Sequence, residues 1–158
     1  MPYSVKVSKW KATGIIARMA KMNILFFNFR DKKHSAAGGS EVVLHRIAEN
    51  WVKKGHKVTI FTAFDRSSKY GKEHLRGEIS KHIEGVRDEI NGVKIIRSGG
   101  RYSVYIRAIE WWFKEGRKLK FDVVIDMINT VPFLTPLFVR GPKLVAFFHQ
   151  LARQVWFY

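Results

Sequence analysis

The chain has 158 residues, 46% of them hydrophobic, which predicts one domain with a sizeable core. It contains no cysteine, which excludes disulfide bonds and thiolate metal sites, and its apolar runs are far shorter than the ~18 residues of a membrane span, so we expect a cytoplasmic protein. The 29 Lys and Arg residues outnumber the 13 Asp and Glu residues and give a formal charge of +16, which favours polyanionic partners of any kind.

Residues 1–21 form a basic leader that contains no acidic residue. Arg18 and Lys21 interrupt the apolar stretch that a signal peptide requires, and Gly14 weakens a continuous helix. Two interpretations stay open: the leader is a basic arm that lies on a membrane, or it is an extension upstream of a natural start at Met22. We therefore expect a basic N-terminal extension over 1–21 and a folded domain over 22–158.

Residues 22–62 predict a strand, a glycine-bearing loop, an amphipathic helix and a second strand, which together form one βαβ unit. We expect Ser40 to cap the helix and Gly55 to end it. One face of the helix is apolar and the other polar: the apolar face is Val43, Leu44, Ile47, Ala48, Trp51 and Val52, and the polar face is His45, Arg46, Glu49, Asn50 and Lys53.

The loop of this unit opens onto the N-terminus of the helix, where unpaired N–H groups and the helix dipole favour an anion. Gly38 and Gly39 would let a diphosphate approach the backbone, and Ser40 would add a hydroxyl. Arg30, Lys32 and Lys33 would make the same loop electropositive. The alternative is that the glycines only shape a tight turn.

Residues 63–91 are polar and glycine-punctuated, and we expect them to be functional, partly mobile, or to hold a short helix or an extra strand. Asn91 and Gly92 then predict a turn, and residues 93–97 a third strand.

A second amphipathic helix is predicted over 102–118, with an apolar face of Tyr105, Ala108, Ile109, Trp112 and Phe113. We interpret Trp111 and Trp112 as core packing and its margin. A strand over 121–129, a short helix or turn over 132–139 and a buried strand over 143–148 follow. Continuous apolar strands that alternate with helices indicate a parallel sheet covered on both faces, so we expect a Rossmann-like α/β fold.

The last residues, 149–158, end in Val155, Trp156, Phe157 and Tyr158. An apolar patch of this kind normally needs a partner surface, so we expect further chain beyond Tyr158.

The order of several motifs resembles the N-terminal domain of GT-B retaining glycosyltransferases of family 4, also called group 1. That domain shows GG-x-E, a helix, and then R/K-G-H-x-V-T; here these are Gly38 to Glu41 and Lys54 to Thr59. Later features agree: Asn91-Gly92-Val93 with Arg97, Phe121-Asp122 entering a strand, and His149 after the last strand. The resemblance covers 22–158.

The resemblance implies transfer of a sugar, of the hexosyl type, from a nucleotide-sugar donor to an acceptor, without a metal cofactor. It places the acceptor in this domain and most of the nucleotide sugar in a C-terminal domain that this chain lacks, so we expect the isolated chain to be inactive. By resemblance His149 would contact the transferred sugar or the acceptor. Asn129, at the end of the fourth strand, and Arg153 are acceptor-site candidates. Many relatives have a histidine near Asn129, where this chain has Asp126 and Asn129.

The basic surface also predicts docking on an anionic membrane, next to a lipid-linked or glycan acceptor. A competing hypothesis is a noncatalytic binding module on the same scaffold, for nucleic acid or an anionic membrane. We do not expect nucleic acid, because no recognised module and no interleaving of basic and stacking aromatic residues is evident.

Overall fold

The computed structural model describes residues 20–69, 71–72, 85–129 and 131–149. A six-stranded sheet with the order β3-β4-β2-β1-β5-β6 runs through the molecule. Every neighbouring pair is parallel except β3 with β4. The strands are β1 (Asn23–Phe27), β2 (Lys57–Thr62), β3 (Val86–Ile90), β4 (Val93–Arg97), β5 (Val123–Ile128) and β6 (Lys143–Phe148).

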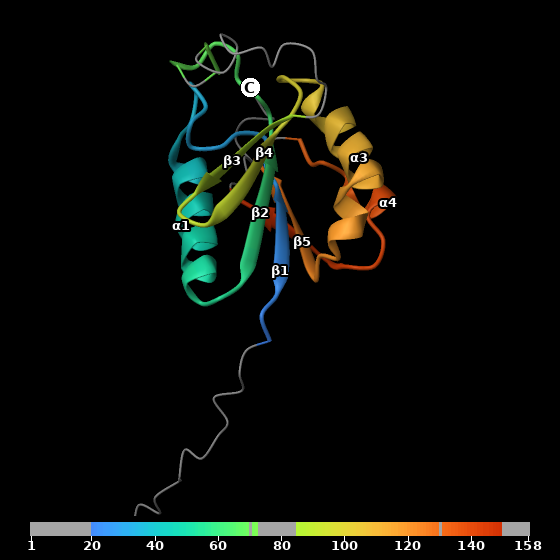
Figure 1. Ribbon diagram of the computed structural model, residues 1–158. Coiled ribbons are helices and arrows are strands. Elements are labelled where there is room, and N and C mark those ends of the chain that lie inside the picture. Colours follow the sequence, from blue (N-terminus) through green and yellow to red (C-terminus); the bar gives the residue numbers. More distant parts are fainter. Residues whose placement is uncertain (1–19, 70, 73–84, 130, 150–158) are drawn as a thin grey trace, which may run out of the picture.

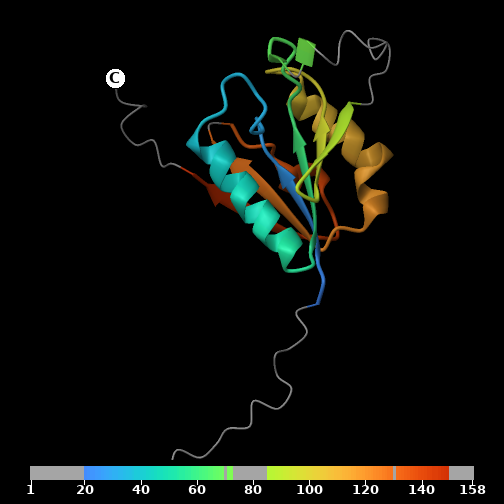
Figure 2. The same ribbon diagram turned by 60° about the vertical axis from the view of Figure 1, so that its left-hand side comes forward.

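Helices cover both faces of this sheet (Figure 1). On one face lies α1 (Gly39–Lys53). The other face carries α3 (Val104–Lys114), the 3-10 helix η2 (Gly116–Leu119) and α4 (Thr135–Phe138). Figure 2 shows α1 and α3 on opposite sides of the strands. The Rossmann-like α/β fold expected from the sequence is confirmed.

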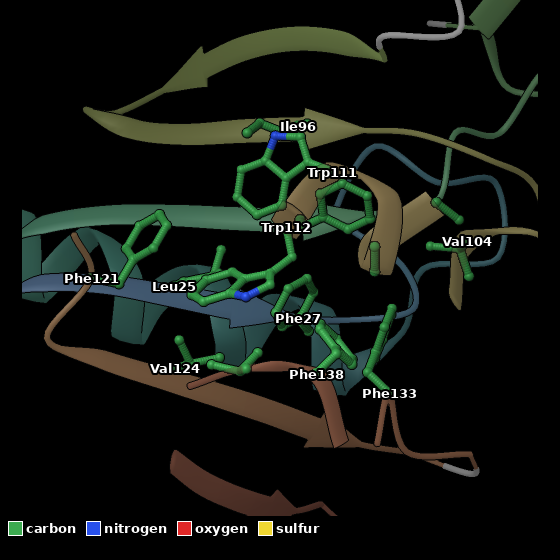
Figure 3. Packing of buried hydrophobic residues seen from close by; sticks show 14 residues of the cluster. Leu25, Phe27, Ile96, Val104, Trp111, Trp112, Phe121, Val124, Phe133 and Phe138 are labelled. Carbon is green, nitrogen blue, oxygen red and sulfur yellow. The ribbon is translucent and has the colours of Figure 1, made fainter. Parts of the chain in front are cut away.

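The two faces have separate hydrophobic clusters because the side chains of each strand alternate between them. On the α1 face, Ile24 and Phe26 of β1 pack with Leu44 and Ala48 of the helix. On the α3 face, Leu25 and Phe27 pack with the α3 side chains. Figure 3 shows this second cluster gathered between α3 and the sheet, with both indole rings inside it.

Trp111 and Trp112 are both buried, so their interpretation as core residues is confirmed. Trp111 lies against Phe61, with ring centroids 5.1 Å apart, and Trp112 stacks on Phe121 at 6.3 Å. The buried face of α3 is nevertheless turned relative to the predicted one, since Ile109 and Phe113 are exposed.

The second helix was predicted to reach residue 118, but α3 ends at Lys114. At Gly116, just past this end, an added Cβ would approach Trp112 to 2.8 Å and Trp111 to 3.0 Å. The chain therefore passes directly beneath the two indoles and continues as the 3-10 helix η2.

Two expectations for α1 are wrong. The helix begins at Gly39 and its N-cap is Gly38, not Ser40, because the Glu41 carboxylate turns back and accepts the Gly38 N–H at 2.7 Å. His45 was placed on the polar face but is buried, whereas Val43 is exposed. The expected end is confirmed: helical residues stop at Lys53, and Gly55 has a φ of 90°.

The polar stretch after β2 does hold an extra strand, β3, which forms a hairpin with β4. The turn residues Asn91 and Gly92 have φ values of 51° and 79°, as a type I′ hairpin turn requires. The predicted turn and the predicted strand 93–97 are thus confirmed. None of the described helices combines the length and the apolar character needed to cross a bilayer.

The strand predicted to be buried over 143–148 is present as β6, but all of its residues are exposed. It lies at the edge of the sheet, and in the described part of the chain it pairs with β5 on one side only. Val145 and Phe147 border an apolar groove of about 400 Å³ that α1 closes with Ile47 and Trp51. Apolar character predicted the strand here, but the edge position decided its exposure.

Candidate functional site

The strand order reverses between β1 and β5. From β1 the chain crosses to β2 over the α1 face, whereas from β4 it returns to β5 over the α3 face. The connections that leave the carboxyl ends of β1 and β5 therefore diverge, which opens a crevice where ligands of open α/β sheets bind.

Two asparagines meet at this point. Asn28 directly follows β1 and is fully buried, and Asn129 directly follows β5. The Asn129 amide nitrogen donates to the Asn28 side-chain oxygen at 3.2 Å. The Asn28 side chain also donates to the carbonyl of Arg30, so it ties the β1 loop to the β5 loop.

A cleft of about 860 Å³ opens at the same end of the sheet. It is lined by the loops that follow four strands, β1, β2, β4 and β5. The lining residues are Phe29, Arg30, His34, Ser35, Ala36, Ala63, Phe64, Asp65, Arg66, Ser67, Gly100, Arg101, Tyr102, Tyr105, Asn129 and Val131.

Positive charge predominates in the lining of this cleft. Arg30, Arg66 and Arg101 stand against a single carboxylate, Asp65. Burial alone would raise the pKa of Asp65, but hydrogen bonds donated by Ser35 and Ser67 outweigh burial and hold that pKa well below its usual range. Asp65 is thus ionised, and its oxygens accept hydrogen bonds from the loops that hold Ser35 and Ser67. The arginines therefore determine the charge that a ligand in the cleft meets.

Aromatic rings form one wall of the cleft. Tyr105 stacks on Phe29 with ring centroids 6.3 Å apart, and the guanidinium of Arg101 lies 5.6 Å from the Tyr102 ring centroid. Burial, with a smaller contribution from the Asp126 charge, raises the pKa of Tyr105, so its hydroxyl stays protonated and can donate a hydrogen bond. A wall of this kind suits the apolar face of a ligand ring beside a charged group.

The β1–α1 loop, which supplies Arg30, His34, Ser35 and Ala36 to the cleft, is held from behind by buried charge. Arg97, at the end of β4, is 2% exposed, and its Nε donates to Asp31 Oδ2 at 2.9 Å while Nη2 contacts the same oxygen. Arg97 Nη1 also reaches Asp88 at 3.1 Å, and Lys33 reaches Asp88 at 2.8 Å. The loop is thus tied to both strands of the β3–β4 hairpin.

These partners fix the protonation of Asp88. Burial would raise its pKa, but the hydrogen bonds from Lys33 and Arg97 prevail and lower that pKa to about 2. Lys32 is engaged as well, since its Nζ lies 2.9 Å from Glu49. Each of the three cations expected to make this loop electropositive thus has a carboxylate partner; of the three, only Arg30 lines the cleft, and it stands 3.5 Å from Glu41.

His45 lies beneath this loop with neither ring nitrogen in a hydrogen bond among the described residues. Burial, reinforced by the positive charge of Lys32, lowers its pKa to about 4. The ring is therefore neutral at physiological pH, which avoids placing another cation beside Arg97.

The predicted phosphate-binding residues Gly38, Gly39 and Ser40 lie next to the cleft in sequence but are not among its lining residues. The Gly38 N–H already bonds to Glu41, whose side chain is fully buried. A Cβ at Gly39 would meet nothing within 4 Å, and neither glycine has a positive φ. No tight turn demands glycine at these two positions, so the alternative interpretation of the glycines finds no support in the geometry.

His149 directly follows β6 and lies beside Asn129, because Ile128 of β5 pairs with Phe148 of β6. Its ring packs edge-on against Phe147 with centroids 5.0 Å apart, and its buried Nε2 has no hydrogen-bond partner among the described residues. The structure thus brings together three strand-end residues, Asn28, Asn129 and His149. Only Asn129 lines the cleft.

Asp126, noted as a departure from relatives, has a structural role. It is buried on β5 and accepts the N–H of Phe133 at 3.1 Å and that of Thr135 at 3.4 Å. Burial raises the pKa of Asp126, and these hydrogen bonds oppose that rise. The carboxylate therefore fixes the turn that enters α4.

Arg153 lies outside the described residues. Sequence reasoning missed the contributions of the loops after β2 and β4, which bring Asp65, Arg66, Arg101 and Tyr105 to the cleft. These loops could have been identified from the sequence, because the carboxyl ends of parallel strands share one edge of the sheet. That rule was applied only to β1, β5 and β6, although it holds for β2 and β4 as well.

Taken together, the cleft can bind a polar ligand with a ring against Tyr105 and an anionic group near the arginines. The sequence model of the family described as Glycosyltransferase Family 4 matches residues 37–158 of this chain. A comparison with curated proteins finds no match.

Proposed function

Because this chain belongs to glycosyltransferase family 4, we propose that it is the acceptor-side domain of an enzyme that transfers a hexosyl group from a nucleotide sugar to an acceptor. The observation that carries the proposal is the cleft at the reversal point of the strand order, since that is where an α/β sheet of this kind binds its ligand. The GT-B architecture, the retaining stereochemistry and the group 1 assignment are parts of the same proposal.

The acceptor occupies the cleft in this proposal. Tyr105 and Phe29 contact the ring of the acceptor, and Arg101 and Arg66 contact an anionic group on it or on the donor. Asn129 donates a hydrogen bond from the cleft floor. His149, one strand further along, faces the reacting sugar, where an imidazole can donate or accept a hydrogen bond.

The donor diphosphate lies over the start of α1. Of the residues Gly38, Gly39 and Ser40 there, Gly39 has open space beside its backbone, and the dipole of a helix of fifteen residues favours negative charge at this end. Catalysis in such an arrangement comes from orienting the two substrates and from stabilising the departing diphosphate. No metal cofactor is part of the proposal.

Most of the contacts to the nucleotide sugar come from a second domain. We therefore expect the purified 158-residue chain to release no nucleoside diphosphate from a nucleotide sugar, whatever acceptor is added. Measurable turnover by this chain alone would contradict the division of labour between the two domains, although not the acceptor site.

The acceptor site is tested by binding. We expect sugar phosphates, titrated into the isotopically labelled chain, to shift the amide resonances around Arg101 and Asn129, in their loops, and around Tyr105, in the first turn of α3. Arg101→Ala should weaken binding about tenfold or more, because a charge-assisted contact to the anionic group is lost. Arg46→Ala, on the exposed face of α1, is the matched control and should leave the affinity unchanged. Shifts confined to other surfaces would contradict the proposal.

A further inference from the structure

The amino end of the sheet, opposite the cleft, carries a dense set of cations. They come from three connections: the α1–β2 turn, the α3–β5 connection and the α4–β6 turn, which lie at the same end of the molecule (Figure 1). All are exposed. They are Lys53, Lys54 and Lys57; Lys114, Arg117, Lys118 and Lys120; and Arg140 and Lys143. We call this surface the basic end.

The strand register makes these connections one continuous surface. Lys57 pairs with Asn23 across β1 and β2, and Lys143 pairs with Val123 across β5 and β6. Three strand spacings of about 4.8 Å put Lys57 and Lys143 roughly 15 Å apart across the sheet, and they lie in adjacent rows because Val123 pairs with Ile24, the residue after Asn23. Asn23 Nδ2 donates to the carbonyl of Leu119 at 2.8 Å, which fastens the α3–β5 connection to the row of Asn23 and Lys57.

The cations of the basic end are not neutralised within the described part of the chain. The three connections contain two carboxylates, Glu115 and Asp122, both in the α3–β5 connection. Glu115 lies 2.6 Å from Arg87 of β3, and Asp122 accepts the Asn23 N–H at 2.7 Å. None of the described ion pairs includes a cation of the basic end. Cations gathered in this way repel one another, and an anionic surface relieves that repulsion.

Apolar side chains stand among these cations. Leu119 is 48% exposed between Lys118 and Lys120, and Lys120 has a φ of 49°, so the chain turns sharply there. Phe113 and Ile109, four residues apart on α3, are exposed on the approach to the same connection. Aliphatic side chains such as Leu119 and Ile109 gain nothing from stacking on nucleic-acid bases, but they enter the boundary between lipid headgroups and acyl chains.

We propose that the basic end docks the protein on an anionic phospholipid bilayer. Lysines bind such a surface without a fixed geometry, and their attraction to it acts over about one Debye length, roughly 10 Å at 0.1 M salt. The inference does not depend on the proposed function, because it rests on residues that lie outside the cleft.

Docking by the basic end fixes the orientation of the cleft relative to the bilayer. Each central strand of five or six residues spans about 15 to 20 Å, and the cleft lies at the far end of those strands. The cleft therefore opens away from the bilayer. An acceptor attached to lipid by a short headgroup cannot reach it in this orientation, whereas a soluble acceptor or a long lipid-linked glycan can.

The test is co-sedimentation of the 158-residue chain with vesicles of phosphatidylcholine, with and without phosphatidylglycerol. The variant Lys57→Glu/Lys118→Glu/Lys143→Glu reverses three charges of the basic end. The matched control, Arg46→Glu/Lys69→Glu/Lys72→Glu, reverses three exposed charges elsewhere and has the same net charge. Circular dichroism establishes that both variants are folded.

We expect the wild-type chain and the control to bind the vesicles that contain phosphatidylglycerol at low salt. Neither should bind the vesicles of phosphatidylcholine alone. The basic-end variant should bind at least about tenfold more weakly than the control. Equal binding by the two variants would overturn the proposal, because net charge alone, or cations outside this surface, would then account for the binding.

A second measurement separates lipid from nucleic acid. Leu119→Gln removes an aliphatic side chain without changing charge, and we expect it to weaken vesicle binding several-fold while leaving the binding of duplex DNA unchanged. Loss of vesicle binding on addition of DNA, together with indifference to Leu119→Gln, would overturn the proposal in favour of a nucleic-acid surface.

Discussion

The two ends of the sheet carry charge in opposite ways. Behind the cleft at the carboxyl end, Asp31 and Asp88 each meet a basic partner, and Arg97 is almost fully buried. At the amino end, lysines such as Lys57 and Lys118 are exposed and stand outside the described ion pairs. The buried charges behind the cleft therefore hold loops in place, whereas the exposed cations of the amino end remain available for an external partner.

The physical basis of this difference is burial. A buried ion is costly unless it is paired and hydrogen-bonded, so the buried charges behind the cleft come as a network. An exposed lysine keeps its water and needs no partner. Substitutions should therefore have large effects on stability behind the cleft and small ones at the basic end.

The largest effect is expected for Arg97→Met. This change leaves the buried carboxylate of Asp31 without its cation, and we expect the free energy of unfolding to fall by about 3–5 kcal/mol in urea titrations. Lys57→Met, the counterpart at the amino end, should change it by about 0.5 kcal/mol or less.

Adding Asp31→Asn to Arg97→Met should restore part of the lost stability, because it removes the unpaired charge. If Arg97→Met and Lys57→Met had equal effects, the contrast between the two ends would fail. If the double variant were no more stable than Arg97→Met alone, the cost would come from packing rather than from charge.

The next effect is a loss of stability at acid pH, caused by protonation of the buried His45. His45 has a pKa lowered from 6.5 to about 4 by burial, so between these values the unfolded chain binds more protons than the folded one. The contribution of His45 to stability is thus complete above pH 6.5 and is lost as pH falls towards 4. The loss should reach about 3 kcal/mol over this range.

Urea titrations at a series of pH values measure this loss. We expect His45→Leu to flatten the dependence between pH 6.5 and 4, whereas Lys57→Met should retain it, because lysine does not titrate in that range. A slope that survives in His45→Leu would assign the acid sensitivity to another group.

A smaller effect is expected at the bond between the two loops that meet at the reversal of strand order. Asn129→Ala removes the hydrogen bond to the buried Asn28 amide, and we expect the free energy of unfolding to fall by about 1 kcal/mol. Asn50→Ala, on the exposed side of α1, is the control and should not lower the free energy of unfolding. An equal effect of the two changes would show that the loops are held by other contacts.

The smallest effect is expected at the basic end. Lys118→Glu relieves repulsion among exposed cations, so we expect stability to rise by about 0.5 kcal/mol or less at low salt. The gain should vanish near 1 M salt, where the Debye length is about 3 Å. A loss of stability at low salt would mean that Lys118 has a favourable contact that the described residues do not account for.

The elements of the fold could largely be predicted from local pattern. The period of apolar residues located α1, β2 and β4 to within a residue or two, and Asn91-Gly92 identified the hairpin turn because both positions need a positive φ. Which side of a helix is buried was harder to predict. His45 is buried although it was expected on the polar face of α1, and Ile109 and Phe113 are exposed although they were expected on the apolar face of α3.

The residues of the candidate site likewise divide into those that could be predicted from local sequence and those that could not. Asn129 and His149 could be predicted as strand-end residues, because an apolar run that predicts a strand and ends in a polar residue places that residue at the end of the strand. The arginines and aromatic rings of the cleft could not, since they come from loops whose separation in sequence says nothing of their distance in space.

The sequence by itself determined the α/β class, the parallel strands and their carboxyl-end edge, because these follow from periodicity and from handed connections. Only the tertiary structure decided which charges are paired. Pairing depends on which loops meet: Arg97 and Asp31 are 66 positions apart yet share a buried contact, while the lysines of the α1–β2 turn and the α3–β5 connection come together with few acidic residues nearby. Local sequence fixes the charge that each residue carries, and the fold fixes whether that charge is neutralised.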